Sequence, residues 1–179
     1  MSQNGSGERS LFVNATDEIE RLFAAEYARV ARLIARVIRD PGRAEELAVE
    51  VFLRYAPGRV AEGATPEGWL CVTAARMALD ELRRRERWAR WRPVFAVGRA
   101  PATPEEIHCA NQEQARVREV LGRLPARQAE MLLLRNEGMR YEELAAALGV
   151  QAGSVGTLLA RAQKAFRREY EERYGTECY

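Results

Sequence analysis

The chain has 179 residues, of which 47% are hydrophobic and 30% charged, and its formal net charge is only +2. No apolar run approaches the roughly 18 residues of a membrane span, and the polar start, MSQNGSGERS, lacks the pattern of a signal peptide. The three cysteines are odd in number and widely spaced, which fits reduced thiols inside the cell better than a disulfide framework, so we expect a cytoplasmic protein. Alanine, arginine, glutamate and leucine dominate, so we expect an all-α protein.

The first half of the chain predicts three helices. The first begins near Asp17, where apolar residues start to recur with a helical period, and Pro41 with its following glycine ends it. Pro66 suits the first turn of the third helix, whose end is rich in arginine. The expected helices cover residues 17–40, 43–56 and 66–92, after a disordered tail at residues 1–15.

The middle of the chain predicts a linker. Residues 93–110 contain three prolines and a glycine and have no sustained period. Beyond them the pattern predicts four helices, at about residues 111–122, 125–136, 141–148 and 153 to the early 170s. We therefore expect two small helical domains, residues 16–92 and residues 111–179, which a flexible linker joins and which move independently.

Cationic charge is concentrated at the end of the third expected helix. Residues 83–92 read RRRERWARWR, six arginines against one glutamate, with Trp88 and Trp91 among them. Arginines neutralise phosphates, and tryptophan rings provide surfaces on which unstacked bases lie. The pattern equally fits a solvated helix face on which arginine stacks on tryptophan within the protein.

A helix-turn-helix is predicted near the C-terminus. Tyr141, Leu144 and Leu148 form one apolar helix face, and a second face begins at Val155. Gly149 between them can adopt the left-handed conformation that two steeply crossing helices require. A plain helical hairpin is the alternative.

Neither an enzyme nor a metal site is indicated. The sequence has no phosphate-cradling glycine loop and no GxSxG motif, and His108 beside Cys109 provides only two of the four ligands of a zinc site. Glu45, Glu46 and Glu50 lie on a predicted helix beside Leu47, which favours an acidic docking face over paired catalytic carboxylates. We expect no cofactor, no bound metal and no catalytic residue.

Over about residues 17–172 the chain resembles an extracytoplasmic-function type RNA polymerase sigma factor of the sigma-70 superfamily. Three stretches carry the resemblance, in the family's order: RAEELAVEVFLRY from Arg43, GWLCVTAARMALDELRRR from Gly68, and LPARQAEMLLLRNEGMRYEELAAALGVQAGSVGTLLARAQKAF from Leu124. They are similar to the polymerase-binding segment, the −10 segment and the −35 helix-turn-helix domain. Family members direct core RNA polymerase to promoters and catalyse nothing themselves.

The resemblance implies a role for each stretch. It implies binding of core RNA polymerase by Glu46, Leu47, Glu50 and Phe52. It implies capture of the opened −10 strand by Arg76, Asp80, Arg83, Arg84, Arg85, Arg87 and Trp88. It implies contact with the −35 element by Gln151, Ser154, Gly156, Thr157, Arg161 and Lys164. The implied partners are core RNA polymerase, promoter DNA and an anti-sigma factor or another regulator.

Some residues depart from the family pattern. Val49 replaces a glutamine in the docking segment, and Arg76 replaces an asparagine that helps the family select −10 bases. Gly156 replaces a lysine in the last helix, and Leu158 stands at a frequently basic position. We therefore expect most of the affinity for DNA to come from the arginine-rich helix and from tethering by polymerase.

Two other interpretations stay open at this level. One is a sigma-like protein-interaction module that reads no −35 sequence, which the poor recognition face favours. The other is a stand-alone helix-turn-helix transcription regulator.

Overall fold

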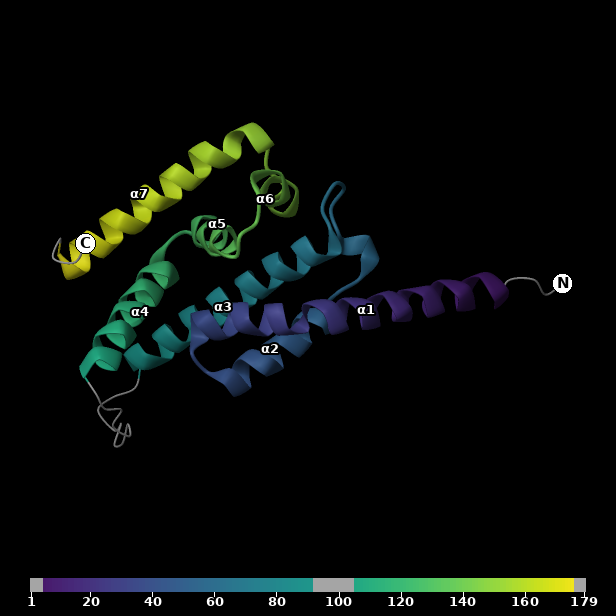
Figure 1. The fold of residues 1–179 in the computed structure, drawn as a ribbon, viewed down its shortest axis with the longest axis horizontal. Coiled ribbons are helices and arrows are strands. Elements are labelled where there is room, and N and C mark those ends of the chain that lie inside the picture. Colours follow the sequence, from purple (N-terminus) through teal and green to yellow (C-terminus); the bar gives the residue numbers. More distant parts are fainter. Residues whose placement is uncertain (1–4, 92–104, 176–179) are drawn as a thin grey trace.

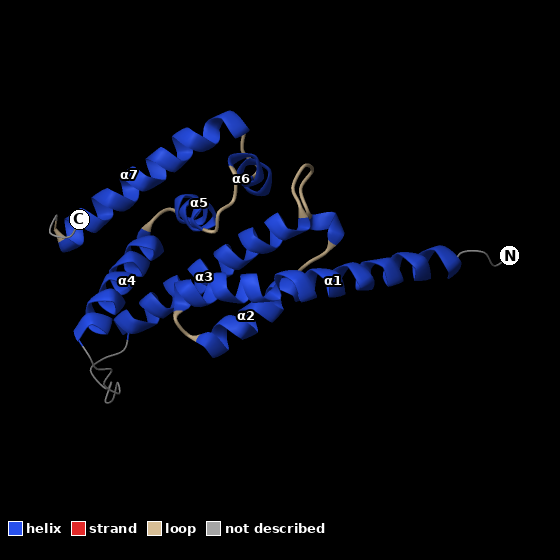
Figure 2. Ribbon diagram, viewed as in Figure 1, coloured by secondary structure: helices blue, strands red, loops and turns tan. Residues whose placement is uncertain are grey.

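The computed structural model describes residues 5–91 and 105–175, and every regular element in these ranges is a helix (Figures 1 and 2). The α-helices are α1 (Gly5–Ile38), α2 (Pro41–Leu53), α3 (Pro66–Trp91), α4 (Glu105–Arg123), α5 (Ala126–Asn136), α6 (Tyr141–Leu148) and α7 (Val155–Tyr174). Short 3-10 turns at Pro57–Arg59 and Ala152–Ser154 precede the loop to α3 and the start of α7. The prediction of an all-α protein is confirmed.

The breaks between helices follow local residue chemistry. Pro41 occupies the first turn of α2, where its missing N–H has no intrahelical partner to lose. The Asp40 side chain caps this helix, because its carboxylate accepts a 3.0 Å hydrogen bond from the Arg43 amide. Gly149 ends α6 with φ 62°, the left-handed corner that the sequence predicts.

Two helices begin earlier than expected. α1 starts at Gly5 instead of near Asp17, so most of the segment expected as a disordered tail is helical. This segment contains no proline that would end the helix before Asp17. α4 starts at Glu105, within the expected linker and directly after its last proline, and residues 92–104 lie outside the described residues.

The two halves of the chain share one apolar core. α5 and α6 lie between α3 and α7 and contact both helices (Figure 1). One cluster of buried side chains includes Ile34, Val51 and Leu70 from the first half and Leu134 and Leu144 from the second. Independent movement of the two domains, which we expected, therefore does not describe this conformation.

The reason lies in α3. Its first four turns bury side chains in almost every direction. These are Leu70, Cys71, Val72, Ala74, Ala75, Met77, Ala78 and Leu79. A helix that is apolar all round needs neighbours on every side. α1 and α2 cover one side of α3, and α4, α5 and α6 cover the other.

Among the described residues, no single helix has the length and apolar character to cross a bilayer. α6 and the helix from Ala152 to Tyr174 together have the length and composition of a membrane span, but their axes are bent by 110°.

Candidate DNA-binding and partner-binding surfaces

α2 turns its apolar residues inward. Leu47 and Phe52, which were expected to bind a partner, are 4% and 2% exposed and belong to the shared core. Phe52 packs edge to face on Phe23 of α1, with ring centroids 4.9 Å apart. Both residues therefore hold α2 in place in this conformation, and their contact with a partner stays a prediction.

The outward face of α2 is a narrow acidic and apolar stripe. Glu46, Val49, Glu50 and Leu53 stand at positions i, i+3, i+4 and i+7, which lie on one side of a helix. Val49 is 41% exposed and Leu53 is 78% exposed, which is unusual for large apolar side chains on a well-packed surface. We call these four residues the α2 stripe.

The two glutamates of the α2 stripe already have weak partners. Glu46 pairs with Arg43 at 2.8 Å, and Glu50 pairs with Arg54 at 2.5 Å, both within the same helix. Exposed pairs of this kind contribute only about 0.3–0.5 kcal/mol. An incoming arginine or lysine of a partner could displace either one at little cost.

The arginines of α3 fall into three environments. The first is a buried network around Glu81, which is 5% exposed. Its carboxylate accepts hydrogen bonds from Arg84 at 2.8 Å and from Arg85 at 2.9 Å. The Arg84 hydrogen bond is the main cause that lowers the pKa of Glu81, so the group is ionised at neutral pH. Arg85 also reaches Asp40 at 2.9 Å, which ties α3 to the start of α2.

The second environment faces the C-terminal half. Arg76 pairs with Glu130 of α5 at 3.2 Å. Arg83 donates to the backbone carbonyls of Gly122 and Leu124, at 3.0 Å each. Arg83, whose side chain is 22% exposed, is thus engaged by the C-terminal half, while Arg76 keeps about half of its side chain exposed beside Glu130.

The third environment is solvent. Asp80, Arg87 and Trp88 are exposed at the end of α3, with 65% of Trp88 accessible. Half of Arg84 is exposed as well, beyond its contact with Glu81. The structure therefore brings Arg84, Arg87 and Trp88 together as an accessible cationic and aromatic end.

α6 and α7 form the predicted helix-turn-helix. The two helices are bent by 110°, within the range of the motif, and Gly149 forms the corner. Val155 and Leu159 of α7 are buried against the domain, so the opposite face of α7 points outward. The exposed residues at its start are Gln151, Thr157, Arg161 and Lys164, while Ser154 and Gly156 are half-buried.

Position 156 has room for a side chain, so packing does not require a glycine there. A Cβ built there would lie 3.7 Å from the Tyr141 ring, which is an ordinary contact. Tyr141 is itself 42% exposed, and the Arg135 guanidinium lies 5.4 Å from its ring centroid. The outward face near Gly156 therefore presents backbone and an aromatic ring where the family places a lysine.

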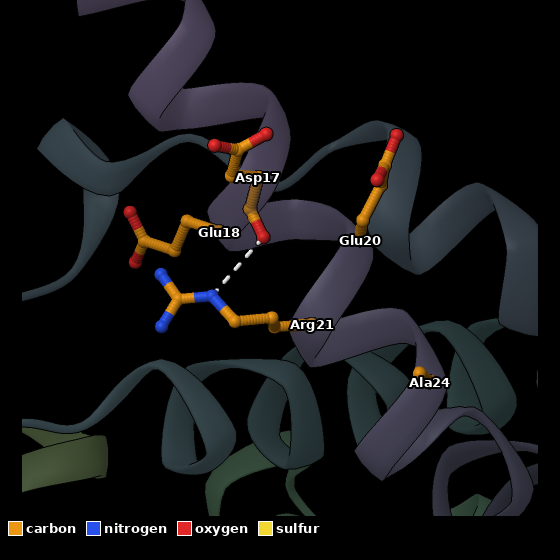
Figure 3. A pocket seen from close by; sticks show the side chains of 5 residues that line it. All are labelled: Asp17, Glu18, Glu20, Arg21 and Ala24. Atoms are coloured by element: carbon orange, nitrogen blue, oxygen red, sulfur yellow. Dashed lines mark hydrogen bonds between the residues drawn. The ribbon is translucent and has the colours of Figure 1, made fainter.

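Two surface depressions are candidates for a small-molecule or metal site. One lies on α1 and is lined by Asp17, Glu18, Glu20, Arg21 and Ala24 (Figure 3). All five come from a single helix, and the hydrogen bond there joins Arg21 Nε to the Asp17 carbonyl at 3.2 Å. Glu18 also accepts a 2.7 Å hydrogen bond from the hydroxyl of Tyr55, which follows α2. The described residues contain no group of three or more ligands for a metal ion.

The other depression, about 230 Å³, lies between the two halves. Arg29 and Cys71 line it from the first half, and Met139 and Glu142 from the second. Burial raises the pKa of the Cys71 thiol to about 11, so it stays protonated and unreactive at neutral pH. The depression is a seam between packed helices, without converging catalytic groups.

Sequence reasoning missed several of these residues. Val49 and Leu53 could have been found from their spacing with Glu46 and Glu50, because the four fall on one helical stripe. Glu130 carries no such signal, since a glutamate on a predicted helix is normally solvated. Only the packing of α5 on α3 brings it to Arg76.

Comparison with known proteins identifies both halves. Residues 22–88 match the family Sigma-70 region 2, and residues 114–166 match the family Sigma-70, region 4. The RNA polymerase sigma factor CarQ of Myxococcus xanthus is 30% identical over 147 residues, which cover 79% of this chain and 82% of CarQ. The ECF RNA polymerase sigma factor SigE of Mycolicibacterium smegmatis is 33% identical over 172 residues, 90% of this chain and 63% of SigE. The chain thus spans less than two thirds of the length of SigE.

Among solved structures, the sigma factor RpoE from Bartonella quintana, crystallised with the anti-sigma factor NepR, matches with a TM-score of 0.48 at 16% identity. The match covers 87% of this chain and 98% of that chain. The firmer evidence is the sequence: regions 2 and 4 occur in order on one chain, and CarQ is similar over most of its length. The chain therefore belongs to the extracytoplasmic-function type of the sigma-70 family of RNA polymerase sigma factors.

Proposed function

We propose that this chain directs core RNA polymerase to promoters by reading the −10 and −35 elements and helping to open the strands. The observation that carries the proposal is the presence of region 2 and region 4 in order on one chain, residues 22–88 and 114–166. The chain itself performs no catalysis. Its place of action is the cytoplasm, with the polymerase.

Docking on core RNA polymerase is assigned to the α2 stripe. Its two glutamates provide negative charge for a basic partner surface, and Val49 and Leu53 provide apolar surface that is buried on binding. Leu47 and Phe52 support the stripe from beneath, because they anchor α2 to α1.

The DNA contacts are assigned to the two cationic ends. Arg84, Arg87 and Trp88, joined by Arg76, Asp80, Arg83 and Arg85, would hold the opened −10 strand through phosphate neutralisation and base stacking. The start of α7 would approach the −35 duplex with Gln151, Ser154, Gly156 and Thr157, and Arg161 and Lys164 would contact phosphates. A regulator such as an anti-sigma factor is a further proposed partner, as the resemblance of the sequence to the family implies.

Run-off transcription tests this proposal. Purified chain and purified core RNA polymerase are mixed with fragments of the source genome, and the transcripts are compared with those of core alone. The proposal expects a small set of fragments to give transcripts only when the chain is present. Absence of such transcripts, with an active core that accepts another sigma factor, would refute it.

A second function, that of a sigma-like interaction module, has one observation in its favour. The recognition face carries Gly156 and Thr157 where stronger base-reading side chains would stand, and its basic residues, Arg161 and Lys164, lie further along α7. Scrambling the −35 sequence of an active fragment separates the two functions. Unchanged transcription would favour the interaction module, and a loss would favour −35 reading.

A further inference from the structure

The start of α7 presents small side chains with methyl groups on its outward face. Val155, Leu159 and Ala162 are buried and fix the opposite face against the domain. Thr157 and Ala160 point away from that face and are both exposed. In a helix-turn-helix the N-terminal residues of the second helix contact the base edges. The side chains of α7 that lie closest to the bases are therefore a threonine and an alanine.

The cations of α7 lie further along the helix. Arg161 and Lys164 share the exposed face with Thr157, four and seven residues later, which is about one and two helical turns. An arginine or lysine that reads guanine must reach its O6 and N7 atoms in the major groove. Because the helix enters the groove with its N-terminal end, these two side chains are placed for phosphates instead.

The cations of α5 and α6 near the start of α7 already have partners. Arg135 donates to the Met139 carbonyl at 2.9 Å, and its guanidinium lies 5.4 Å from the centroid of the Tyr141 ring. Arg140 pairs with Glu143 at 2.9 Å at the start of α6. The first helix of the motif crosses the DNA backbone. We therefore place both arginines beside phosphates and not at the base edges.

Gly156 allows the backbone of α7 to come close to the bases. A Cβ added there would meet the Tyr141 ring at 3.7 Å, an ordinary contact, so the glycine has no role in packing. A residue without a side chain permits close approach of the backbone to a ligand. The methyl groups of Thr157 and Ala160 can then reach the base edges, whereas a long side chain at position 156 would keep the helix further out.

These side chains match thymine and adenine. The C5 methyl of thymine is the apolar group that the major groove displays, and alanine and threonine methyls contact it. Glutamine forms two hydrogen bonds with adenine N6 and N7. Gln151 is exposed directly before the 3-10 turn that leads into α7. Guanine presents two acceptors that favour arginine or lysine, which the start of α7 lacks.

We propose that this chain selects T·A and A·T base pairs where the start of α7 meets the −35 duplex, with Thr157 and Ala160 on thymine methyl groups and Gln151 on an adenine. The inference rests on the proposed function, because it assumes that α7 enters the −35 groove. It adds the identity of the bases. A lysine at position 156 would favour guanine instead.

Selection from a DNA pool tests the base preference. Holoenzyme is reconstituted from the full chain and core RNA polymerase and binds copies of a transcribed fragment whose −35 segment is randomised, and the bound DNA is sequenced. We expect thymine and adenine to be enriched where α7 contacts the duplex. Gly156→Lys, at a position with room for the side chain, should shift the enrichment toward guanine. Enrichment of guanine in place of thymine and adenine by the wild type would overturn the proposal.

Deoxyuridine tests the methyl contacts, because it pairs as thymine does and lacks only the C5 methyl. Each contacted thymine of the selected sequence, replaced by deoxyuridine, should weaken holoenzyme binding about fourfold, the effect of one buried methyl group. Deoxyuridine outside the −35 segment and the opened −10 segment is the control and should leave binding unchanged. Equal binding of the thymine and deoxyuridine duplexes at every selected position would overturn the proposal.

Thr157→Ser removes the matching methyl group from the protein and keeps the hydroxyl. It should weaken binding to the thymine duplex about fourfold, and deoxyuridine at the thymine that Thr157 contacts should then have no further effect. Thr65→Ser is the matched control: it also removes one methyl and keeps the hydroxyl that accepts from the Gly68 amide at 3.1 Å. The effect of deoxyuridine should stay fourfold in this control.

The outcomes separate this inference from the proposed function. A wild-type chain that gives no transcript with an active core polymerase refutes the proposed function and this inference together. Transcription that persists with no base preference in the −35 segment refutes the inference alone. Thymine and adenine enrichment, with the fourfold effect of deoxyuridine abolished at one position by Thr157→Ser, supports both.

Discussion

At the scale of single residues, burial separates side chains that hold the fold from those available to partners. Leu47 and Leu53 lie six positions apart on α2, yet one is buried in the core and the other is 78% exposed. Arg85 and Arg87 differ in the same way: Arg85 contacts Asp40 and Glu81, and Arg87 points to solvent. Residues of the same type on one helix therefore have different roles.

Glu50→Arg tests the α2 stripe. The substitution places a positive charge where a basic partner surface is expected, and like charges across an interface are costly. We expect affinity for core RNA polymerase to fall about tenfold, which corresponds to 1.4 kcal/mol. The fold should remain intact, because Glu50 is partly exposed and its pair with Arg54 is weak. Glu171→Arg, the same charge change at an exposed position of α7, is the control, and an equal effect of both would argue against the stripe.

Glu81→Gln tests the buried network of α3. The amide cannot satisfy Arg84 and Arg85 as the carboxylate does, so we expect the free energy of unfolding at neutral pH to fall by about 2 kcal/mol. The folded-state pKa of Glu81 lies below its ordinary value of 4.5. Its contribution is therefore full above pH 4.5 and is lost as the pH falls through the lower folded-state pKa.

Urea unfolding at neutral pH and in acid measures this difference. The difference in the free energy of unfolding between wild type and Glu81→Gln should become smaller as the pH is lowered. A gap that stays constant with pH would show that the ionised carboxylate is not what stabilises the network.

At the scale of elements, α3 and α7 should bind different forms of DNA. The logarithm of the DNA-binding constant falls linearly with the logarithm of the salt concentration, and we call the steepness of this line the salt slope. Each phosphate contact adds about 0.7 to the salt slope on a single strand and about 0.9 on a duplex. Neutralising Arg84 and Arg87 should thus lower the holoenzyme's slope by about 1.4 on DNA with an opened −10 segment. Neutralising Arg161 and Lys164 should lower it by about 1.8 on a −35 duplex.

The matched pairs of charges make the comparison direct, because each variant removes two cations. The α3 variant should leave the salt slope on the −35 duplex nearly unchanged, and the α7 variant should leave that on the opened −10 DNA nearly unchanged. If the α7 pair lowered the slope on the opened −10 DNA as much as the α3 pair does, the assignment of the elements would be wrong.

Local signals predicted the elements well and their partners poorly. Pro41, Pro66 and Gly149 placed helix breaks close to where they occur, because proline and glycine act through their own backbone geometry. The period of apolar residues indicated that α3 is buried, but not which helices cover it. Contacts such as Arg76 with Glu130 join residues more than fifty positions apart and depend on packing alone.

At the scale of the whole molecule, the shared core predicts cooperative unfolding. The main apolar cluster includes side chains from both halves, so neither half buries its surface without the other. We expect one calorimetric transition for the free chain, with calorimetric and van't Hoff enthalpies that agree. Two resolved transitions would mean that the halves are separately stable and that the seam contributes little.

A weak recognition face on α7 is tolerable when polymerase holds both halves of the chain on one DNA, because tethering raises the effective concentration of the second site.

The central claim is that this chain brings two separate DNA-reading faces to core RNA polymerase. Footprinting of the reconstituted holoenzyme on a fragment that supports run-off transcription tests it most directly. We predict two protected segments centred about 25 base pairs apart, both absent with core alone, and reactive single-stranded bases within the downstream one. A single protected segment, or a footprint unchanged from that of core polymerase, would contradict the account.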